Sequence, residues 1–206
     1  MKIYDISMTI SENMMVYKNK PEKRPQIINT VNFNDHKHYE SKISMDLHTG
    51  THIDAPLHMI KDGETMEMYQ VENFVTKAKV IDLTHLENSI TQSDIENIPI
   101  EKDDFVLFKT RNSFSEEFNT DFVYLEKSGA RYLKQLGIKG VGIDGLGIER
   151  NQPEHETHKL LFENSIMIIE GLRLKDIVPD VYTLICLPLK IIETEAAPAR
   201  AILIKE

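Results

Sequence analysis

The chain has 206 residues, of which 41% are hydrophobic and 28% charged, a composition that excludes a disordered or fibrous protein. Its length suits one domain over residues 1–206, and its formal net charge of −9 disfavours nucleic acid and anionic membranes as partners. A single cysteine, Cys186, excludes an internal disulfide, and the chain lacks the run of about 18 apolar residues that a membrane span requires.

Short strands dominate the elements predicted for the first half of the chain. Residues 1–6 alternate apolar and polar side chains, and they lack the apolar stretch of a signal peptide, so we expect a cytoplasmic protein. Ser93 and Glu96 form a capping-box pattern, which predicts a short helix that stops before Pro99. The further strands predicted in this half are 26–33, 43–47 (with Ile43, Met45 and Leu47 on one face), 79–83 and 104–110.

Helices and strands alternate in the second half. Ser128 to Leu136 is predicted as a helix that Gly137 ends, and residues 155–163 as another helix. A strand-rich chain with few helices indicates an α/β or α+β domain with a mixed β-sheet. The strands predicted here are 139–144, 165–170, 181–192 and 199–204.

Three of the eight histidines lie within eleven residues, at His48, His52 and His58, together with Asp54. A zinc-protease helix is a poor interpretation, because Gly50 and its β-branched neighbours disfavour a helix and the expected glutamate is missing. In an extended chain, His52 and Asp54 project to the same side, and a turn at Gly50 allows His48 to join them. Two imidazoles and a carboxylate form a site suited to zinc, manganese or iron, whereas a solvated loop has no need of so many imidazoles.

A second polar group lies further along the chain. His155 and His158 are three residues apart and share one face of the predicted helix. We expect His155 to be a solvated surface residue. For His158 and Glu170, a structural role and a ligand role are balanced, although a carboxylate at the end of the apolar strand Ile166–Ile169 is costly to bury without a partner.

Two other polar residues have simpler interpretations. Cys186 lies in the apolar stretch Leu184–Leu187, which favours a buried and unreactive thiol over a nucleophile. Asp144 ends a predicted strand, and we expect it to be an acidic turn residue rather than a residue of a catalytic cleft.

The segment His48–His58, with the sequence HTGTHIDAPLH, resembles the signature H-x-G-T-H-x-D-x-P-x-H of the cyclase family of metal-dependent hydrolases. That family includes bacterial kynurenine formamidase and isatin hydrolase. His158-Lys-Leu-Leu with Ile168–Leu172 is similar to the second metal-binding segment of the family. Pro188–Ile191 with Ala197–Ala201 resembles its C-terminal pair of strands. The resemblance therefore covers nearly the whole chain.

The resemblance implies an α/β fold of the swivelling β/β/α type in a single domain, and a homodimer or a higher homo-oligomer. It also implies one or two divalent ions, with zinc expected and manganese as an alternative. By position, His48, His52 and Asp54 would hold one ion. Asp54, His158 and Glu170 would hold the second, with Asp54 bridging the two.

The same resemblance implies a catalytic role for His58 as a general acid and base. Tyr17 would stack on an aromatic substrate, with ordinary core or interface packing as the alternative interpretation. One departure lies beside it: relatives usually have Pro-Gly-Asp-Pro after this tyrosine, whereas this chain has Lys18-Asn19-Lys20-Pro21.

The function implied is that of a metal-dependent hydrolase of a small amide, either an N-formyl arylamine such as N-formylkynurenine or a cyclic amide. Water activated by the metal would attack the carbonyl, and His58 would carry the proton. Lactone hydrolysis, cyclisation or dehydration on the same site is the alternative. A metal-binding protein without turnover is a third hypothesis, which a histidine beyond the metal ligands argues against. The expected partner in each enzymatic case is a small-molecule substrate.

Overall fold

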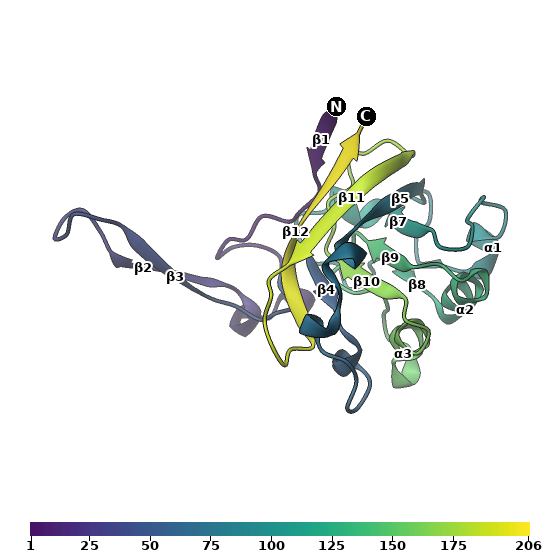
Figure 1. Ribbon diagram of the computed structural model, residues 1–206, viewed down its shortest axis with the longest axis horizontal. Coiled ribbons are helices and arrows are strands. Elements are labelled where there is room, and N and C mark those ends of the chain that lie inside the picture. The colour runs from purple at the N-terminus through teal and green to yellow at the C-terminus, as the bar shows by residue number, and fades with distance from the viewer.

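Seven strands close into a barrel in the computed structural model, which describes residues 1–206 (Figure 1). The ring runs β12-β11-β5-β7-β9-β10-β4, and β4 pairs with β12 to close it, while β1 extends the sheet beyond β12. The strands are β1 Lys2–Asp5, β4 His52–Asp54, β5 Val75–Asp82, β7 Phe105–Lys109, β9 Gly140–Ile143, β10 Met167–Glu170, β11 Val181–Pro188 and β12 Ala196–Lys205.

The sheet is mixed, as the sequence predicts. Pairing is parallel from β5 through β7 and β9 to β10, and antiparallel at every other junction of the ring. Three of these strands, β7, β9 and β10, are buried on both faces, which explains why the sequences of β7 and β9 are almost continuously apolar. The α/β class and the expected swivelling type are confirmed.

Two apolar cores lie on the two sides of this sheet. Phe105 and Leu107 of β7 belong to a core to which every strand of the ring except β9 contributes. Val106 and Phe108 point the other way, into a core shared with the helices. The helices α1 Gln92–Ile95, α2 Lys127–Leu136 and α3 Glu156–Phe162 lie together on that side of the barrel (Figure 1).

No helix of the molecule is both long enough and apolar enough to cross a membrane.

Further short elements join the main strands. Two short strands, β6 Ser89–Ile90 and β8 Tyr124–Leu125, pair in parallel. The 3-10 helices are η1 Tyr17–Asn19, η2 Pro21–Lys23, η3 Pro56–His58, η4 Met66–Met68, η5 Val71–Phe74, η6 Arg111–Phe114 and η7 Pro153–His155.

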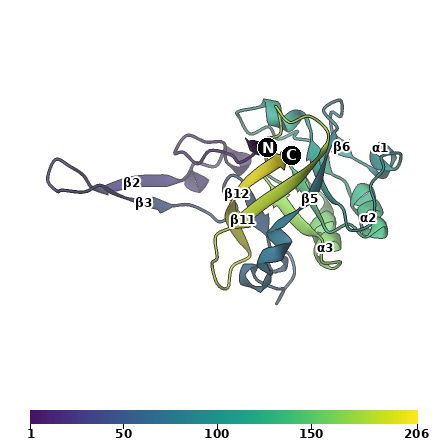
Figure 2. The same cartoon turned by 45° about the horizontal axis from the view of Figure 1, so that its top comes forward.

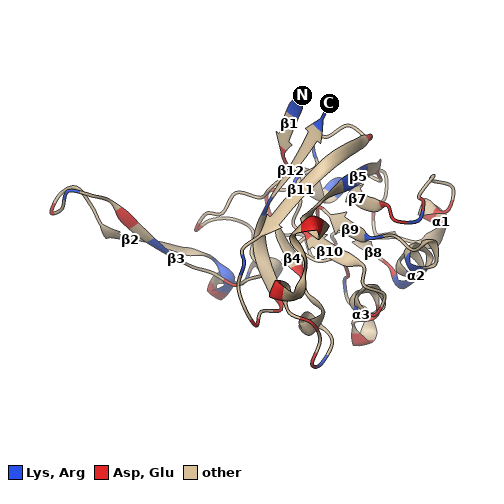
Figure 3. Ribbon diagram, in the orientation of Figure 1, with Lys and Arg blue, Asp and Glu red and all other residues tan.

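A two-stranded arm, residues 26–44, extends away from the barrel (Figures 1 and 2). It consists of β2 Gln26–Val31 and β3 Glu40–Ser44, which pair only with each other. Charged residues occur in β3, at Glu40 and Lys42, and in the loop before it, at Asp35 and Lys37, whereas β2 has none (Figure 3). The arm also exposes large apolar side chains, with Phe33 70% and Ile28 51% exposed.

Two local predictions were wrong. The strand predicted at 43–47 is β3, which ends at Ser44, and Ile43 faces solvent rather than a core because the arm has no second layer to pack against. The capping box lies earlier than Ser93 and Glu96: Thr91 is the N-cap, and its backbone N–H donates to Asp94 Oδ2 at 2.7 Å. Thr91 is extended whereas the residues after it are helical, which defines where the helix starts.

Candidate metal and catalytic site

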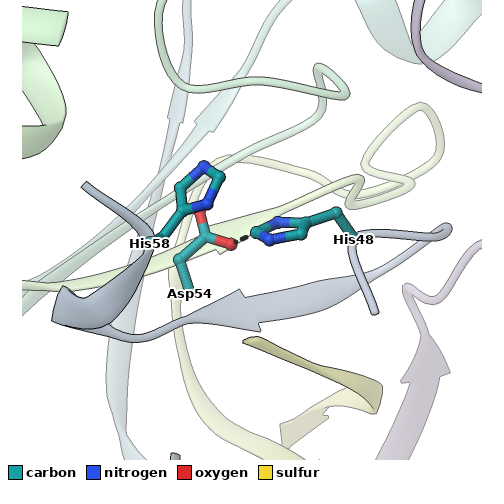
Figure 4. Close-up of side chains that lie close together, drawn as sticks. All are labelled: His48, Asp54 and His58. Carbon is teal, nitrogen blue, oxygen red and sulfur yellow. Dashed lines mark ion pairs between the residues drawn. The ribbon is translucent and has the colours of Figure 1, made fainter. Parts of the chain in front are cut away.

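The histidine-rich segment folds as a turn followed by a buried strand. Gly50, with a φ of +66°, makes the turn in a conformation that favours glycine. In β4, His52 and Asp54 lie on the same side of the strand and are fully buried. His48 folds back so that its Nδ1 lies 2.9 Å from Asp54 Oδ1 (Figure 4). The expectation of an extended chain that turns at Gly50 is confirmed.

A second glycine lets the two predicted polar groups meet. Gly171 follows β10 with a φ of +69°, and a Cβ atom there would lie 2.2 Å from Gly50 O. Thr51 Oγ1 donates to Gly171 O at 2.6 Å and ties the two segments together. The crossing places Glu170, the last residue of β10, opposite His52 in the register of the sheet.

Asp54 and Glu170 each face the same two histidines, His52 and His158. Asp54 Oδ1 is 3.3 Å from His52 Nε2, and Asp54 Oδ2 is 3.7 Å from His158 Nε2. Glu170 Oε2 is 3.4 Å from His52 Nε2, and Glu170 Oε1 is 3.4 Å from His158 Nε2. The structure therefore brings together all five residues predicted as metal ligands.

The donor atoms at the centre fit a divalent ion. His52 Nε2 and both carboxylate oxygens of Asp54 are buried without a hydrogen-bond partner, a costly arrangement unless something else binds them. Ligands about 2.1 Å from a tetrahedral ion lie about 3.4 Å from one another, which matches the separations between these atoms. His52, Asp54 and Glu170 form one compact ligand group, and His48, Asp54 and His58 form another.

Neighbouring backbone groups fix the orientation of the ligands. His52 Nδ1 lies 2.9 Å from Gly50 O, which can only accept, so Nδ1 carries a proton and Nε2 is the ring nitrogen directed at Asp54 and Glu170. Glu170 Oε1 accepts from the backbone N–H of Ile148 at 2.5 Å. The ligand atoms are therefore held before any ion arrives.

The electrostatics of the cluster keep both carboxylates ionised. Burial raises the pKa of Asp54, but the facing histidines outweigh it and hold that pKa well below its usual range. Burial and Asp54 raise the pKa of Glu170, yet His158 and His52 bring it to about 2. At neutral pH the site thus presents two carboxylates to a cation.

His58 lies beside this cluster, in η3 directly after β4. Its ring centroid is 4.2 Å from that of His48 and 5.5 Å from that of His158, and Figure 4 shows it above Asp54. Burial lowers the pKa of His58 to about 4, with further lowering from His48 that Asp54 opposes. The imidazole is therefore neutral near pH 7 and able to accept a proton.

Glu149 is a site residue that the sequence analysis missed. Its buried Oε1 lies 3.0 Å from His158 Nδ1 and 2.7 Å from His155 Nδ1, and its Oε2 accepts from the backbone N–H of Thr157 at 2.9 Å. His155 is largely exposed, as expected, but it also contacts this acid. The only signal in the sequence is that an acid precedes the His155-x-x-His158 pair by a few residues.

Asp144 lies in a bend directly after β9, as expected, but it also has a structural role that the sequence did not indicate. It is buried, and it accepts hydrogen bonds from Thr110 N at 2.7 Å, Thr110 Oγ1 at 2.6 Å and Ser113 Oγ at 2.6 Å. Its role is to join the ends of β7 and β9. Cys186 is buried, as predicted, and burial raises the pKa of its thiol to about 12, which leaves it unreactive.

A cavity of about 350 Å³ opens onto the cluster, a size that suits a small molecule. Tyr17 lines it and stands edge-on to Phe118, with ring centroids 5.2 Å apart, so it both packs and faces the cavity. The lining combines cluster residues, apolar residues and lysines; it includes His48, His58, Glu149, His158, Glu170, Met15, Met59, Leu146, Lys18, Lys20 and Lys23.

Known proteins resemble this chain in both sequence and structure. The family model "Putative cyclase" matches residues 4–150. Kynurenine formamidase of Bacillus mycoides (strain KBAB4) is 33% identical over 164 residues, covering 79% of this chain and 78% of the relative. A solved structure described as a potential metal-dependent hydrolase with cyclase activity is 49% identical, with a TM-score of 0.91 over 98% of this chain and 96% of the other. Isatin hydrolase A from Labrenzia aggregata, bound to benzyl benzoate, is 25% identical, with a TM-score of 0.85 over 98% and 93%.

Proposed function

Because the chain belongs to the putative cyclase family, we propose that it hydrolyses a small amide, with an N-formyl arylamine or a cyclic amide as the substrate. Its relatives place it among the metal-dependent hydrolases that act on C–N bonds other than peptide bonds. The observation that carries the proposal is the convergence of Asp54 and Glu170 on His52 and His158, beside a cavity that Glu170 and His158 line.

We propose zinc as the ion, held by His48, His52 and Asp54, with a second ion held by Asp54, His158 and Glu170. Mixed nitrogen and oxygen donors suit zinc, and manganese is the alternative. The two oxygens of Asp54 face different histidines, which supports a bridging role for this carboxylate. When bound, a divalent ion supplies water whose pKa is lowered to about 7 and polarises the substrate carbonyl.

His58 moves the proton in this proposal. Water adds to the amide carbon, forming a C–O bond, and the neutral imidazole of His58 takes the proton that the water loses. The same proton then passes to the nitrogen as the C–N bond breaks, so that an amine and a carboxylic acid leave, and the acid loses its remaining proton to solvent. Since the lowered pKa of His58 keeps it neutral before the reaction, it begins the cycle ready to act as a base.

A second candidate reaction uses the same residues. The 49% identical neighbour is described as having cyclase activity, so lactone hydrolysis, cyclisation or dehydration at this site is the alternative. These reactions yield different products from the same ligand set. Product analysis on a panel of small amides, cyclic amides and lactones separates them.

We also propose that the chain works as a homodimer or a higher homo-oligomer. The arm supports this, because a two-stranded hairpin is marginally stable in water on its own, and here Ile28, Phe33 and Tyr39 are exposed. A second copy of the chain would cover these side chains. Light scattering on the purified protein measures the assembly, and a strict monomer at micromolar concentration contradicts it.

The test of the proposed activity is hydrolysis of formanilide and N-formylkynurenine by the zinc-loaded protein. We expect turnover that a chelator abolishes and that added zinc or manganese restores. A heat-inactivated sample and a metal-only blank are the controls. If no amide or lactone is hydrolysed at any metal loading, the hydrolase proposal is wrong.

A further inference from the structure

Three lysines stand on one wall of the cavity that leads to the metal-binding cluster. Lys18 lies in η1, Lys23 in η2 and Lys20 between the two, and all three line the same cavity as His58 and Glu170. No other lysine or arginine lines this cavity. In a chain whose net charge is −9, these three lysines thus gather at the cavity of the candidate active site, which Asp46, Glu149 and Glu170 also line.

Two of these three cations have no acidic partner. Lys23 Nζ is 2.9 Å from Asp46 Oδ2, so its charge is balanced within the wall. Neither Lys18 nor Lys20 has a carboxylate within 4.0 Å, and the Lys18 ammonium lies 5.3 Å from the centroid of the Tyr17 ring. The wall therefore has a surplus of positive charge next to an aromatic ring.

The backbone that carries these lysines is held in an unusual conformation. Lys18 and Asn19 both have positive φ, at 59° and 51°, which is costly for residues other than glycine and persists only where the surroundings hold it. Asn19 N donates to Val16 O at 2.9 Å, and Lys23 N donates to Lys20 O at 3.0 Å. The fold thus sets the backbone from which the exposed side chains of Lys18 and Lys20 extend.

Charge and polarity are divided along the cavity. Among the lining residues, Glu149 and Glu170 both face His158. Apolar side chains of Met15, Met59 and Leu146 line the cavity as well. A molecule bound there meets a cluster for its reacting group, apolar contacts for its body and unpaired ammonium groups on one wall.

On this basis we propose that the substrate is an anionic amide, with its negative group bound by Lys18 and Lys20 and its amide directed to the metal cluster. The inference rests on the proposed function and narrows it to one substrate class, small amides that carry a carboxylate away from the scissile bond. An ammonium group attracts a carboxylate but gives no such advantage to a neutral amide of the same shape.

The experiment compares matched substrates on the zinc-loaded full chain. The ortho, meta and para isomers of formamidobenzoate are the anionic substrates, and the corresponding formamidobenzamides are their neutral counterparts. We expect kcat/KM to favour at least one anionic isomer over its counterpart. In the Lys18→Gln/Lys20→Gln variant we expect that preference to fall about tenfold, mainly through KM, as two partly exposed charge pairs would give.

A matched variant controls for the overall charge of the molecule. Lys102→Gln/Lys134→Gln removes the same two charges from exposed positions outside the cavity, and we expect it to keep the wild-type preference. Raising the salt concentration should weaken the preference of the wild type, because these lysines are exposed. An equal preference in wild type and in the Lys18→Gln/Lys20→Gln variant overturns the proposal.

Failure of this proposal is distinguishable from failure of the proposed function. Equal hydrolysis of anionic and neutral amides leaves the hydrolase intact and overturns the anionic substrate. If no amide is hydrolysed, calorimetry on the same proteins still tests the anionic site. It compares the equilibrium binding of aminobenzoates with that of aminobenzamides. A preference for the carboxylate that disappears with Lys18→Gln/Lys20→Gln upholds the anionic site, and a preference that persists without these lysines overturns it.

Discussion

The strand β4 and the arm are both built from extended chain, but their surroundings are opposite. All three residues of β4 are buried, and the strand pairs with β10 on one side and β12 on the other. Nearly every residue of β2 and β3 is exposed, and these strands pair only with each other. Extended chain alone therefore does not place ligand atoms precisely. In β4 that precision comes from hydrogen bonding at both edges of the strand and from burial of both its faces.

The largest effect is expected from removing the carboxylate of Asp54, at the centre of the cluster that β4 positions. Asp54→Ala leaves three histidines without the acid that faces each of them, so we expect loss of bound metal and of essentially all activity. Elemental analysis after loading with zinc measures the loss. Asp46→Ala, in the same cavity but paired with Lys23, is the control and should keep its metal. Full metal occupancy in Asp54→Ala would remove the bridging role.

A substitution at His58 tests whether this residue carries a proton or instead binds the metal. His58→Ala should keep its metal and lose about 10²-fold to 10⁴-fold in kcat, since only the proton transfer is affected. Metal content and turnover are measured on one preparation, with the exposed His85→Ala as the control. Loss of metal would make His58 a ligand beside His48 and Asp54, and wild-type turnover would exclude the catalytic role.

The close contact between Gly171 and Gly50 should make a substitution at Gly171 costly in stability. Gly171→Ala places a Cβ atom 2.2 Å from Gly50 O in a left-handed conformation, so we expect a loss of about 3 kcal/mol in the free energy of unfolding. Gly137→Ala is the matched control. It also has positive φ, +74°, but its nearest neighbour is a flexible lysine side chain at 3.5 Å, and we expect a loss of about 1 kcal/mol. Equal losses, measured by urea unfolding, would show that backbone conformation and not the crossing is what matters.

Glu149 tests whether residues behind the ligands contribute to the precision of the buried region. Glu149→Ala removes the acceptor that faces His158 Nδ1, and we expect zinc affinity to fall about 10-fold to 100-fold. Glu149→Gln keeps an acceptor oxygen and should restore part of that affinity. Competition with a chromogenic chelator measures both variants. An unchanged affinity in Glu149→Ala would make this acid a purely structural residue.

The smallest effect is expected in the arm. Ile28→Ser/Phe33→Ser removes exposed apolar side chains that contact no core, so the free energy of unfolding of the barrel should change by less than about 0.5 kcal/mol. The same variant should weaken self-association, which light scattering at several concentrations detects. A large loss of barrel stability together with unchanged assembly would mean that the arm serves the fold of its own chain.

Much of the buried region could be predicted from the sequence because its chemistry is local. His48, His52 and Asp54 lie within seven residues, and the alternation of an extended chain already places two of them on one side. Glu170 drew notice because an acid at the end of an apolar strand needs a partner. The mixed sheet followed from a strand-rich order of elements with few helices.

The roles that sequence analysis missed depend on contacts across the chain. Asp144 resembles an ordinary turn residue until β7 brings Thr110 and Ser113 to it. Glu149 gains its role only when α3 places His158 beside it. The alternation at residues 43–47 carried no information on what would cover its apolar face, because a periodic pattern describes a strand and not its neighbours.

The closure of the ring at β4 also bears on how the protein would respond to losing its ions. In a zinc finger, the metal supplies the folding free energy, so the apoprotein is unfolded. Here β4 is clamped by hydrogen bonds from two neighbouring strands, and the apolar cores on both sides of the sheet do not involve the ligand atoms. Chelation should therefore leave a folded apoprotein that takes up metal again without refolding.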